Sequence, residues 1–295
     1  MRRLVASAVA RLTLVLLAAG PGGCAAPPAA TPEQTRAGLV MLIPGMRGDA
    51  SLLYGAANGL LEAGVDREVQ IYDWYRFPSL ANLVDYERNC AHADEIARRL
   101  VAYHGQNPAS PIDVIGYSAG GGLAIMALER LPEEVRVRRL VLVQAAVSPD
   151  YDLTRAVRRV RDRVVNLHCP SDWFVLGLGT QVFGTVDRRC VHSAGKGGFD
   201  AERALPEATA RWKLVQIAWQ REMMGTLHFG GHVGILLRAW NRRFFAPLIL
   251  ADDLRDVPPA PSPDPGPGGF APLADASRAV PLWPTAWPLY CSPPW

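Results

Sequence analysis

The 295-residue sequence predicts an α/β fold in which helices cover both faces of a mostly parallel central sheet. From residue 38 onward, short apolar runs alternate with amphipathic segments, as they do where helices connect parallel strands. Several runs are apolar at every position, which is typical of strands buried on both faces. Nearly half of all residues are apolar and a fifth are charged, which permits a sizeable core.

Each expected strand is a short apolar run that ends in turn-forming residues. The first run, GLVMLIPG, stops at Pro44 and Gly45, which cannot continue a strand. The fourth run, VRRLVLVQAAV, is apolar on both faces. The predicted strands are 38–45, 67–74, 111–117, 137–147, 164–172 and 213–219.

The expected helices have apolar residues at helical intervals. The longest lies at 80–105, where Leu83, Ala91, Ile96, Leu100 and Val101 share one face. The others are 51–64, the segment after residue 118, 151–163 and 233–250. No internal repeat is present.

Segment 113–131, DVIGYSAGGGLAIMALERL, breaks an apolar run with glycines around Ser118. The pattern G-x-S-x-G between a strand and a helix is typical of a strained turn that exposes a nucleophilic serine. Gly116 and Gly120 would leave the space that this turn requires. Alternatively, Ser118 only caps the helix. Ser193, in HSAGKGG, has no apolar strand before it, so its glycines indicate a loop.

With these flanking elements, the motif around Ser118 resembles the nucleophile turn of the α/β-hydrolase superfamily, and the resemblance spans residues 38–250. It implies an α/β-hydrolase fold and the chain order nucleophile, acid, histidine. Bacterial exported hydrolases and lipase-like esterases are the most similar members. The resemblance implies no metal and no organic cofactor.

In this family the acid follows a strand beyond the nucleophile, and Asp172 ends the run VVNLHCPSD. It would fix the tautomer of the catalytic imidazole and stabilise the cation. Asp150 and Asp152, after the preceding strand, are alternatives, because some members take the acid from there. All three are also compatible with turns.

The resemblance places the base in the loop after the last strand, where LHFGGHVG contains two histidines. His232 is preferred, because neighbouring glycines leave room for its ring. His228 is the alternative and could instead pack against the loop. His92, His104, His168 and His192 are expected to be surface or packing residues.

The family's oxyanion hole takes backbone amides from the residue after the nucleophile and from an early loop. These positions correspond to Ala119 and Met46. Pro44 stands where many relatives have histidine, so the second donor stays open. Arg47 could bind a charged substrate group, although a solvated arginine is the simpler interpretation.

These residues together predict a serine hydrolase of carboxylic esters that forms an acyl-enzyme intermediate. A thioesterase or amidase with the same triad is an alternative, as is a non-catalytic lipid-anchored binding protein on a hydrolase fold. The glycine-containing segment 175–206 could form a mobile lid. The substrate class and oligomeric state stay open.

Residues 1–23 have the pattern of an export signal, with arginines before the apolar run 12–19 and small residues after it. That run is too short to span a bilayer, which takes roughly 20 residues. Cys24 resembles the lipidated cysteine of bacterial lipoproteins, which predicts a membrane-anchored protein of the cell envelope. Pro21 departs from that pattern, and secretion or a periplasmic location is the alternative.

The expected organisation continues with a flexible tether at 24–37, a hydrolase domain at 38–253 and a proline-rich tail at 254–295. The tail could dock its tryptophans or be disordered. The net charge of +3, from 31 basic and 28 acidic residues without a basic block, gives no indication of nucleic-acid binding.

Cysteine usage is compatible with export. The four cysteines after residue 24, Cys90, Cys169, Cys190 and Cys291, permit disulfides in three pairings or buried free thiols. A Cys169–Cys190 bond would close the shortest loop.

Overall fold

A computed structural model of the chain describes residues 25–75, 82, 85–172, 176, 184–252 and 254. These residues contain a six-stranded, entirely parallel sheet in the order β2-β1-β3-β4-β5-β6. The predicted α/β fold with a parallel sheet is confirmed. The strands are β1 (Leu39–Ile43), β2 (Glu68–Ile71), β3 (Ile112–Tyr117), β4 (Arg139–Val143), β5 (Val164–His168) and β6 (Leu214–Ala218).

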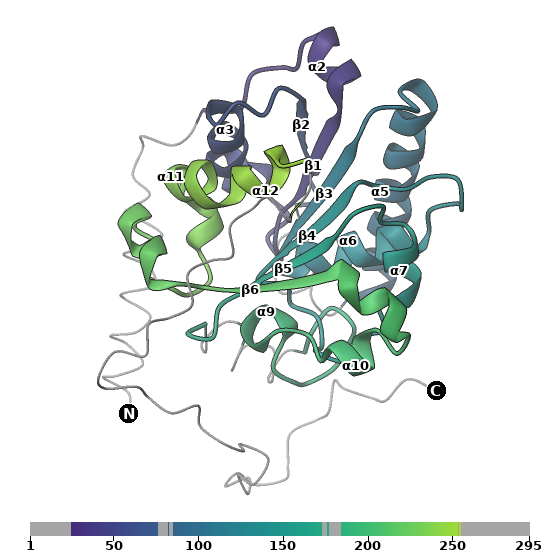
Figure 1. Cartoon of the computed structure of the whole chain (residues 1–295), viewed down its shortest axis with the longest axis vertical. Coiled ribbons are helices and arrows are strands. Elements are labelled where there is room, and N and C mark those ends of the chain that lie inside the picture. The colour runs from purple at the N-terminus through teal and green to yellow at the C-terminus, as the bar shows by residue number, and fades with distance from the viewer. Residues whose placement is uncertain are drawn as a thin grey trace, which may run out of the picture.

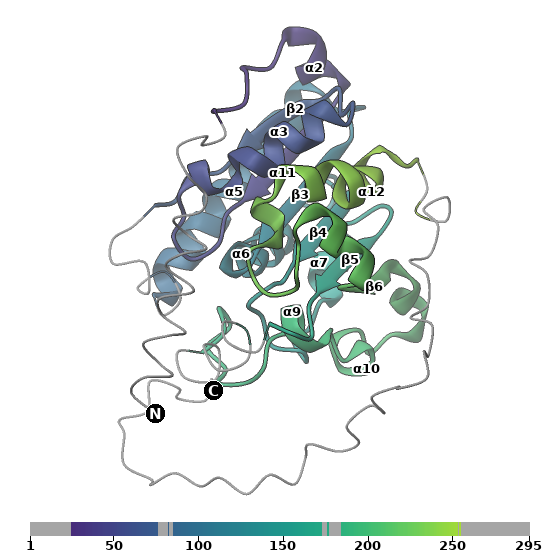
Figure 2. The ribbon, with the colours of Figure 1, turned by 90° about the vertical axis from the view of Figure 1, so that its left-hand side faces the viewer.

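Helices cover both faces of this sheet (Figure 1). One face carries α5 (Tyr86–Gln106), α6 (Ala119–Glu129) and α7 (Thr154–Arg158). The other face, turned toward the viewer in Figure 2, carries α3 (Tyr54–Glu62), α11 (Arg238–Trp240) and α12 (Ala246–Leu250). The remaining elements are α2 (Pro32–Ala37), η1 (Ala50–Leu53), α9 (Ala194–Gly197), α10 (Ala201–Ala204), η3 (Ala208–Lys213), η4 (Arg221–Thr226), η5 (Gly234–Leu236) and η6 (Asn241–Phe245).

The alternation of side chains along each strand divides the core into two layers. In β1, Leu39, Met41 and Ile43 pack toward α5 and α6, whereas Val40 and Leu42 pack toward α3 and α12. Every residue of the central strands β1, β3 and β4 is buried. This explains why these runs are apolar without alternation, apart from the buried charged residues Asp113 and Arg139 near the starts of β3 and β4.

The last helix differs from the prediction over 233–250. A 3-10 turn occupies Gly234–Leu236, the backbone is extended at Leu237, and helical structure resumes at Arg238. Asn241–Phe245 then forms a π turn. Because Pro247 has no N–H and crowds the preceding turn, a wider turn before it is physically expected.

The tether prediction differs from the structure over Pro32–Ala37. This segment is helix α2, closed by a capping box between Thr31 and Gln34. The Tyr103 hydroxyl donates to the Thr35 carbonyl at 2.6 Å, so α2 is attached to α5. Residues 1–24, including Cys24, and the tail from 255 onward lie outside the described residues.

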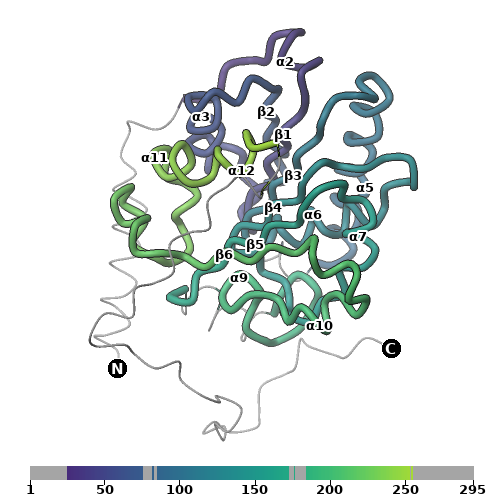
Figure 3. The backbone as a smooth tube through the Cα atoms, in the orientation of Figure 1, coloured from purple at the N-terminus to yellow at the C-terminus, as the bar shows by residue number. Residues whose placement is uncertain are grey.

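The region between acid and histidine is packed where it is described. Helix α9 lies on β5 (Figure 3), and the Gly195 N–H donates to the Ala145 carbonyl at 2.9 Å. A Cβ on Gly195 would lie 2.2 Å from the Gln144 carbonyl carbon. This glycine therefore permits close packing of α9 on the segment that follows β4.

The structure excludes all three pairings of the four cysteines, because each of them would bond both Cys90 and Cys169. Cys90 and Cys169 are free thiols, and Cys190 is disulfide-bonded. The Cys169–Cys190 bond, which would close the shortest loop, is therefore not formed. Within the described part of the chain, no helix is long and apolar enough to cross a membrane.

Candidate active site

Ser118 occupies a sharp turn between β3 and α6. Its backbone has φ 54° and ψ −122°, a conformation that costs free energy for a residue with a side chain. A Cβ on Gly120 would lie 2.3 Å from the Ile43 carbonyl oxygen. A Cβ on Gly116 would lie 2.6 Å from the Gly120 carbonyl oxygen. Both motif glycines are thus required by close backbone packing, as the sequence pattern predicts.

Backbone hydrogen bonds hold this turn in place. The Ser118 N–H donates to the Val143 carbonyl at the end of β4 (3.0 Å). The Ser118 carbonyl accepts from the N–H groups of Gly121 and Ala146, each at 3.0 Å. The strained serine is therefore clamped between α6 and the segment that follows β4.

The side chains of Ser118, His232 and Asp172 form one hydrogen-bonded chain. Nε2 of His232 lies 2.8 Å from Oγ of Ser118, and its Nδ1 lies 2.6 Å from Oδ2 of Asp172. Since a carboxylate only accepts, Nδ1 carries the proton and Nε2 is left to accept from the serine hydroxyl. This arrangement can withdraw a proton from Ser118.

Asp172 is held rigidly after β5. Its side chain is 2% exposed, and its N–H donates to the Cys169 carbonyl at 3.0 Å. Its second oxygen, Oδ1, is 3.4 Å from the N–H of Leu176. Both carboxylate oxygens therefore have donors, as a buried charge requires.

The loop that carries His232 depends on two glycines and on buried partners. Gly230 and Gly231 have φ of 83° and 89°, a region that favours glycine. The Gly231 N–H donates to the Cys169 sulfur at 3.2 Å, and the Tyr117 hydroxyl donates to the His232 carbonyl at 2.8 Å. Burial raises the pKa of Tyr117, so its hydroxyl stays a neutral donor.

The alternative acids, Asp150 and Asp152, have partners other than His232. Asp150 pairs with Arg189 at 2.9 Å, and Asp152 accepts from the Thr154 N–H at 2.9 Å. The hydrogen bond of His232 is with Asp172, which is the acid that the sequence favoured.

The alternative base, His228, is buried and packs edge-to-face against Trp240. Burial lowers the pKa of His228 to about 4, which keeps its ring neutral. A Cβ on Gly234 would lie 1.9 Å from its Nε2, so the ring fills the space beside that glycine. The ring of His228 therefore packs against the loop, and the ring that contacts Ser118 is that of His232.

The two predicted oxyanion donors lie near Ser118, Ala119 as the next residue in the chain and Met46 through the fold. Ala119 is its successor at the first position of α6, where free amides and the helix dipole favour negative charge. A Cβ on Gly45 would lie 3.1 Å from the Ser118 Cβ, which brings the Gly45–Met46 peptide beside the serine. The Met46 carbonyl accepts from the Asn82 amide at 2.7 Å.

Gln144, which follows β4, is a further residue of the site that no sequence motif marks. This buried side chain donates from Nε2 to the Gly231 carbonyl and lies 3.5 Å from Oδ2 of Asp172. Its backbone has φ 49°, a second strained position next to the site. The signal was a polar residue at the end of the apolar run LVLVQAA.

No cluster of three or more His, Cys, Asp or Glu side chains in the described residues could hold a metal ion. No protein-family model and no curated protein matches the sequence.

Solved structures resemble the fold. A poly(3-hydroxybutyrate) depolymerase of Bordetella parapertussis is 13% identical, with a TM-score of 0.47 over 75% of this chain and 80% of its own. A Bacillus licheniformis lipase is 13% identical, with a TM-score of 0.44 over 76% of this chain and 96% of the lipase. Carboxyl esterase 2 of Tuber melanosporum is 11% identical, with a TM-score of 0.39 over 75% of this chain and 78% of the esterase.

The parallel sheet, the strand–serine–helix turn and the chain order Ser118, Asp172, His232 are those of the α/β-hydrolase fold.

Proposed function

We propose that the protein is a serine hydrolase that acts on carboxylic esters. The observation that carries this proposal is the hydrogen-bonded chain from Asp172 through His232 to the strained Ser118, with links of 2.6 and 2.8 Å. Such a chain lowers the cost of forming a nucleophilic alkoxide at neutral pH.

In the proposed reaction, Ser118 Oγ attacks the ester carbonyl while its proton moves to Nε2 of His232. The tetrahedral oxyanion would be stabilised by the amides of Ala119 and Met46. As the intermediate collapses, the proton passes to the departing alcohol and an acyl-serine forms. Water attacks this acyl group, His232 takes and returns its proton, and the carboxylic acid leaves. Throughout, Asp172 holds the ring and stabilises its cationic form.

The geometry favours this proposal over a non-catalytic scaffold. A serine with positive φ costs about 1–3 kcal/mol, and a glycine at the turn would avoid that cost. Retaining serine there, in contact with an imidazole that a buried carboxylate orients, has a chemical benefit only if the hydroxyl reacts.

Replacing the nucleophile tests the proposal. Ser118→Ala is expected to lower turnover of a p-nitrophenyl short-chain ester by about four orders of magnitude or more, with the circular dichroism spectrum unchanged. Ser193→Ala is the matched control, because Ser193 is also buried but its hydroxyl has no hydrogen-bond partner among the described residues. A fluorophosphonate should label the native chain and the Ser193 variant but not Ser118→Ala.

Undiminished turnover by folded Ser118→Ala would contradict the proposal, and so would a native chain inert to the fluorophosphonate. A panel of ester, thioester and anilide substrates with one shared acyl group separates the esterase from a thioesterase or amidase. We expect the ester to give the highest kcat/KM.

We also propose that the chain is exported and anchored to the cell-envelope membrane by a lipid on Cys24. The arginines and apolar run that precede Cys24 support this. The Asn58 amide donates to the Ala25 carbonyl at 2.8 Å, which holds the residue after Cys24 against α3. On expression in bacteria, radiolabelled palmitate should be incorporated into the native chain but not into Cys24→Ser. Equal labelling of both would contradict the anchor.

A further inference from the structure

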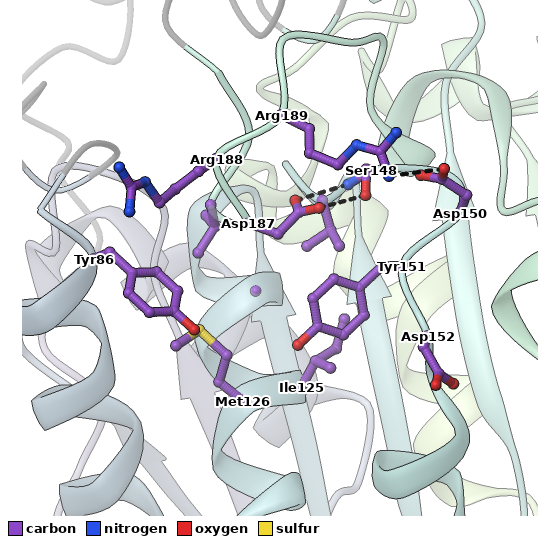
Figure 4. Close-up of a pocket in the computed structure, with 13 residues that line it drawn as sticks. Tyr86, Ile125, Met126, Ser148, Asp150, Tyr151, Asp152, Asp187, Arg188 and Arg189 are labelled. Carbon is purple, nitrogen blue, oxygen red and sulfur yellow. Dashed lines mark hydrogen bonds and ion pairs between the residues drawn. The ribbon is translucent and has the colours of Figure 1, made fainter. Parts of the chain in front are cut away.

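A cavity of about 550 Å³ lies on the α5–α6 side of the molecule (Figure 4). Its walls come from the start of α5, the outer face of α6, the segment after β4 and the turn 185–189. It reaches α6 at Gly122, about one helical turn beyond Ser118. Its volume lies within the range of small-molecule binding sites.

The interior of this cavity is apolar and aromatic. Ile125 and Met126 of α6 form part of its floor, with Val186 beside them. The rings of Tyr86 and Tyr151 stand on opposite sides (Figure 4). The Tyr151 hydroxyl donates to both carboxylate oxygens of Glu129, at 3.1 and 3.2 Å, which fixes that ring. An apolar or aromatic group would therefore be well accommodated between the two tyrosines.

Three aspartates line the rim, and each has a partner. Asp150 forms an ion pair with Arg189, and Asp187 accepts from both the N–H and the hydroxyl of Ser148. Asp152 accepts a hydrogen bond from the Thr154 N–H two residues further on. The contacts of Asp150 and Asp187 fasten the turn 185–189 to the segment after β4, so this wall of the cavity is built into the fold.

Arg188 is different, because its guanidinium has no hydrogen bond or ion pair with any described residue. It lies at the rim on the Tyr86 side (Figure 4). Its backbone has φ 64° in a turn that Thr185 and Arg189 close through mutual hydrogen bonds. A strained residue held with an unpaired cation beside an apolar cavity suggests anion recognition.

We propose that this cavity binds a small organic anion that has an apolar or aromatic body and a terminal carboxylate. The body would lie between Tyr86 and Tyr151 over Met126, and the carboxylate would pair with Arg188. This site is independent of the proposed ester hydrolysis, since none of its residues belongs to the Ser118–His232–Asp172 chain.

Isothermal titration calorimetry on the full chain tests this with two matched probes, 4-phenylbutyrate and its neutral amide. We expect one molecule of the acid to bind per chain, at least tenfold tighter than the amide. Arg188→Asn removes the cation, and asparagine tolerates the positive φ. This variant should bind 4-phenylbutyrate about tenfold more weakly and bind the amide with unchanged affinity. Arg188→Lys should restore part of the difference.

The control is Arg98→Gln, which removes an exposed arginine of α5 that pairs with Glu95 and leaves the cavity intact. It should not change either affinity. Ile125→Trp, which fills the floor, should abolish binding of both probes. Equal affinity for acid and amide would overturn the proposal, and so would full affinity for the acid in Arg188→Asn. The arginine variants decide the question if the tryptophan variant fails to fold.

Discussion

At the scale of single residues, the site is built from strained positions. Ser118 and Gln144 have positive φ, and each follows directly after a central strand of the sheet. Because β3 and β4 are neighbours and parallel, their carboxyl ends bring these two residues to the same edge. Strain of this kind persists only where surrounding contacts determine it. Here backbone hydrogen bonds do so, since the Ser118 N–H donates to the Val143 carbonyl and the Gln144 N–H donates to the Leu167 carbonyl.

Gln144 links the acid to the histidine loop. Its amide nitrogen donates to the Gly231 carbonyl and lies 3.5 Å from Oδ2 of Asp172. Gln144 therefore connects the loop of Asp172 to the loop of His232 without using the His232 side chain. Its amide oxygen has no partner among the described residues. The donor end of this side chain is therefore the part that the site uses.

Gln144→Met keeps the approximate volume of the side chain and removes the donor. We expect kcat for ester hydrolysis to fall about tenfold with little change in KM, because the Gly231 carbonyl loses its buried partner and His232 is less well placed. Gln70→Met, at the edge strand β2, is the matched control and should be neutral. Steady-state kinetics measure both, and a Gln144→Met variant with native kcat would exclude this role.

At the scale of elements, the sequence predicted what depends on neighbours in the chain. The strands, helix α6 and the turn at Ser118 follow from apolar periodicity and glycine spacing, which are local properties. Chain order also led to Asp172 and His232, which the structure places in contact. A family resemblance supplied that order, since spacing alone leaves Asp150 and His228 open.

The elements that differed from prediction depend on tertiary packing. The α-helix expected from Val233 begins only at Arg238, after a 3-10 turn at Gly234–Leu236 and the extended residue Leu237, and Gly234 leaves room there for the buried ring of His228. Within segment 175–206, whose glycines suggested a lid, Gly195 allows α9 to lie against Gln144. Gln144 itself had no motif, because its partners lie 28 and 87 residues away.

At the scale of the whole molecule, a charged cluster secures the end of the sheet opposite to Ser118. Asp113, near the start of β3, is fully buried and pairs with Arg67 (2.6 Å) and with Arg138. Both arginines also donate to the Ile249 carbonyl at the end of α12. The neighbouring Arg139 is fully buried and donates to the Leu248 carbonyl at 2.7 Å. The cluster therefore joins the central strands to the last helix.

Asp113→Ala should destabilise the fold by about 3–5 kcal/mol, because it leaves two largely buried guanidinium groups without their carboxylate. Asp94→Ala is the matched control. Its carboxylate is 51% exposed and pairs with Arg130 at the surface, so we expect a loss of about 1 kcal/mol or less. Urea unfolding would measure both. Because Asp113 lies at the far end of β3 from Ser118, kcat of the folded Asp113→Ala variant should stay near the native value. A small stability loss, or a large loss of kcat in the folded variant, would show that the cluster does not act as described.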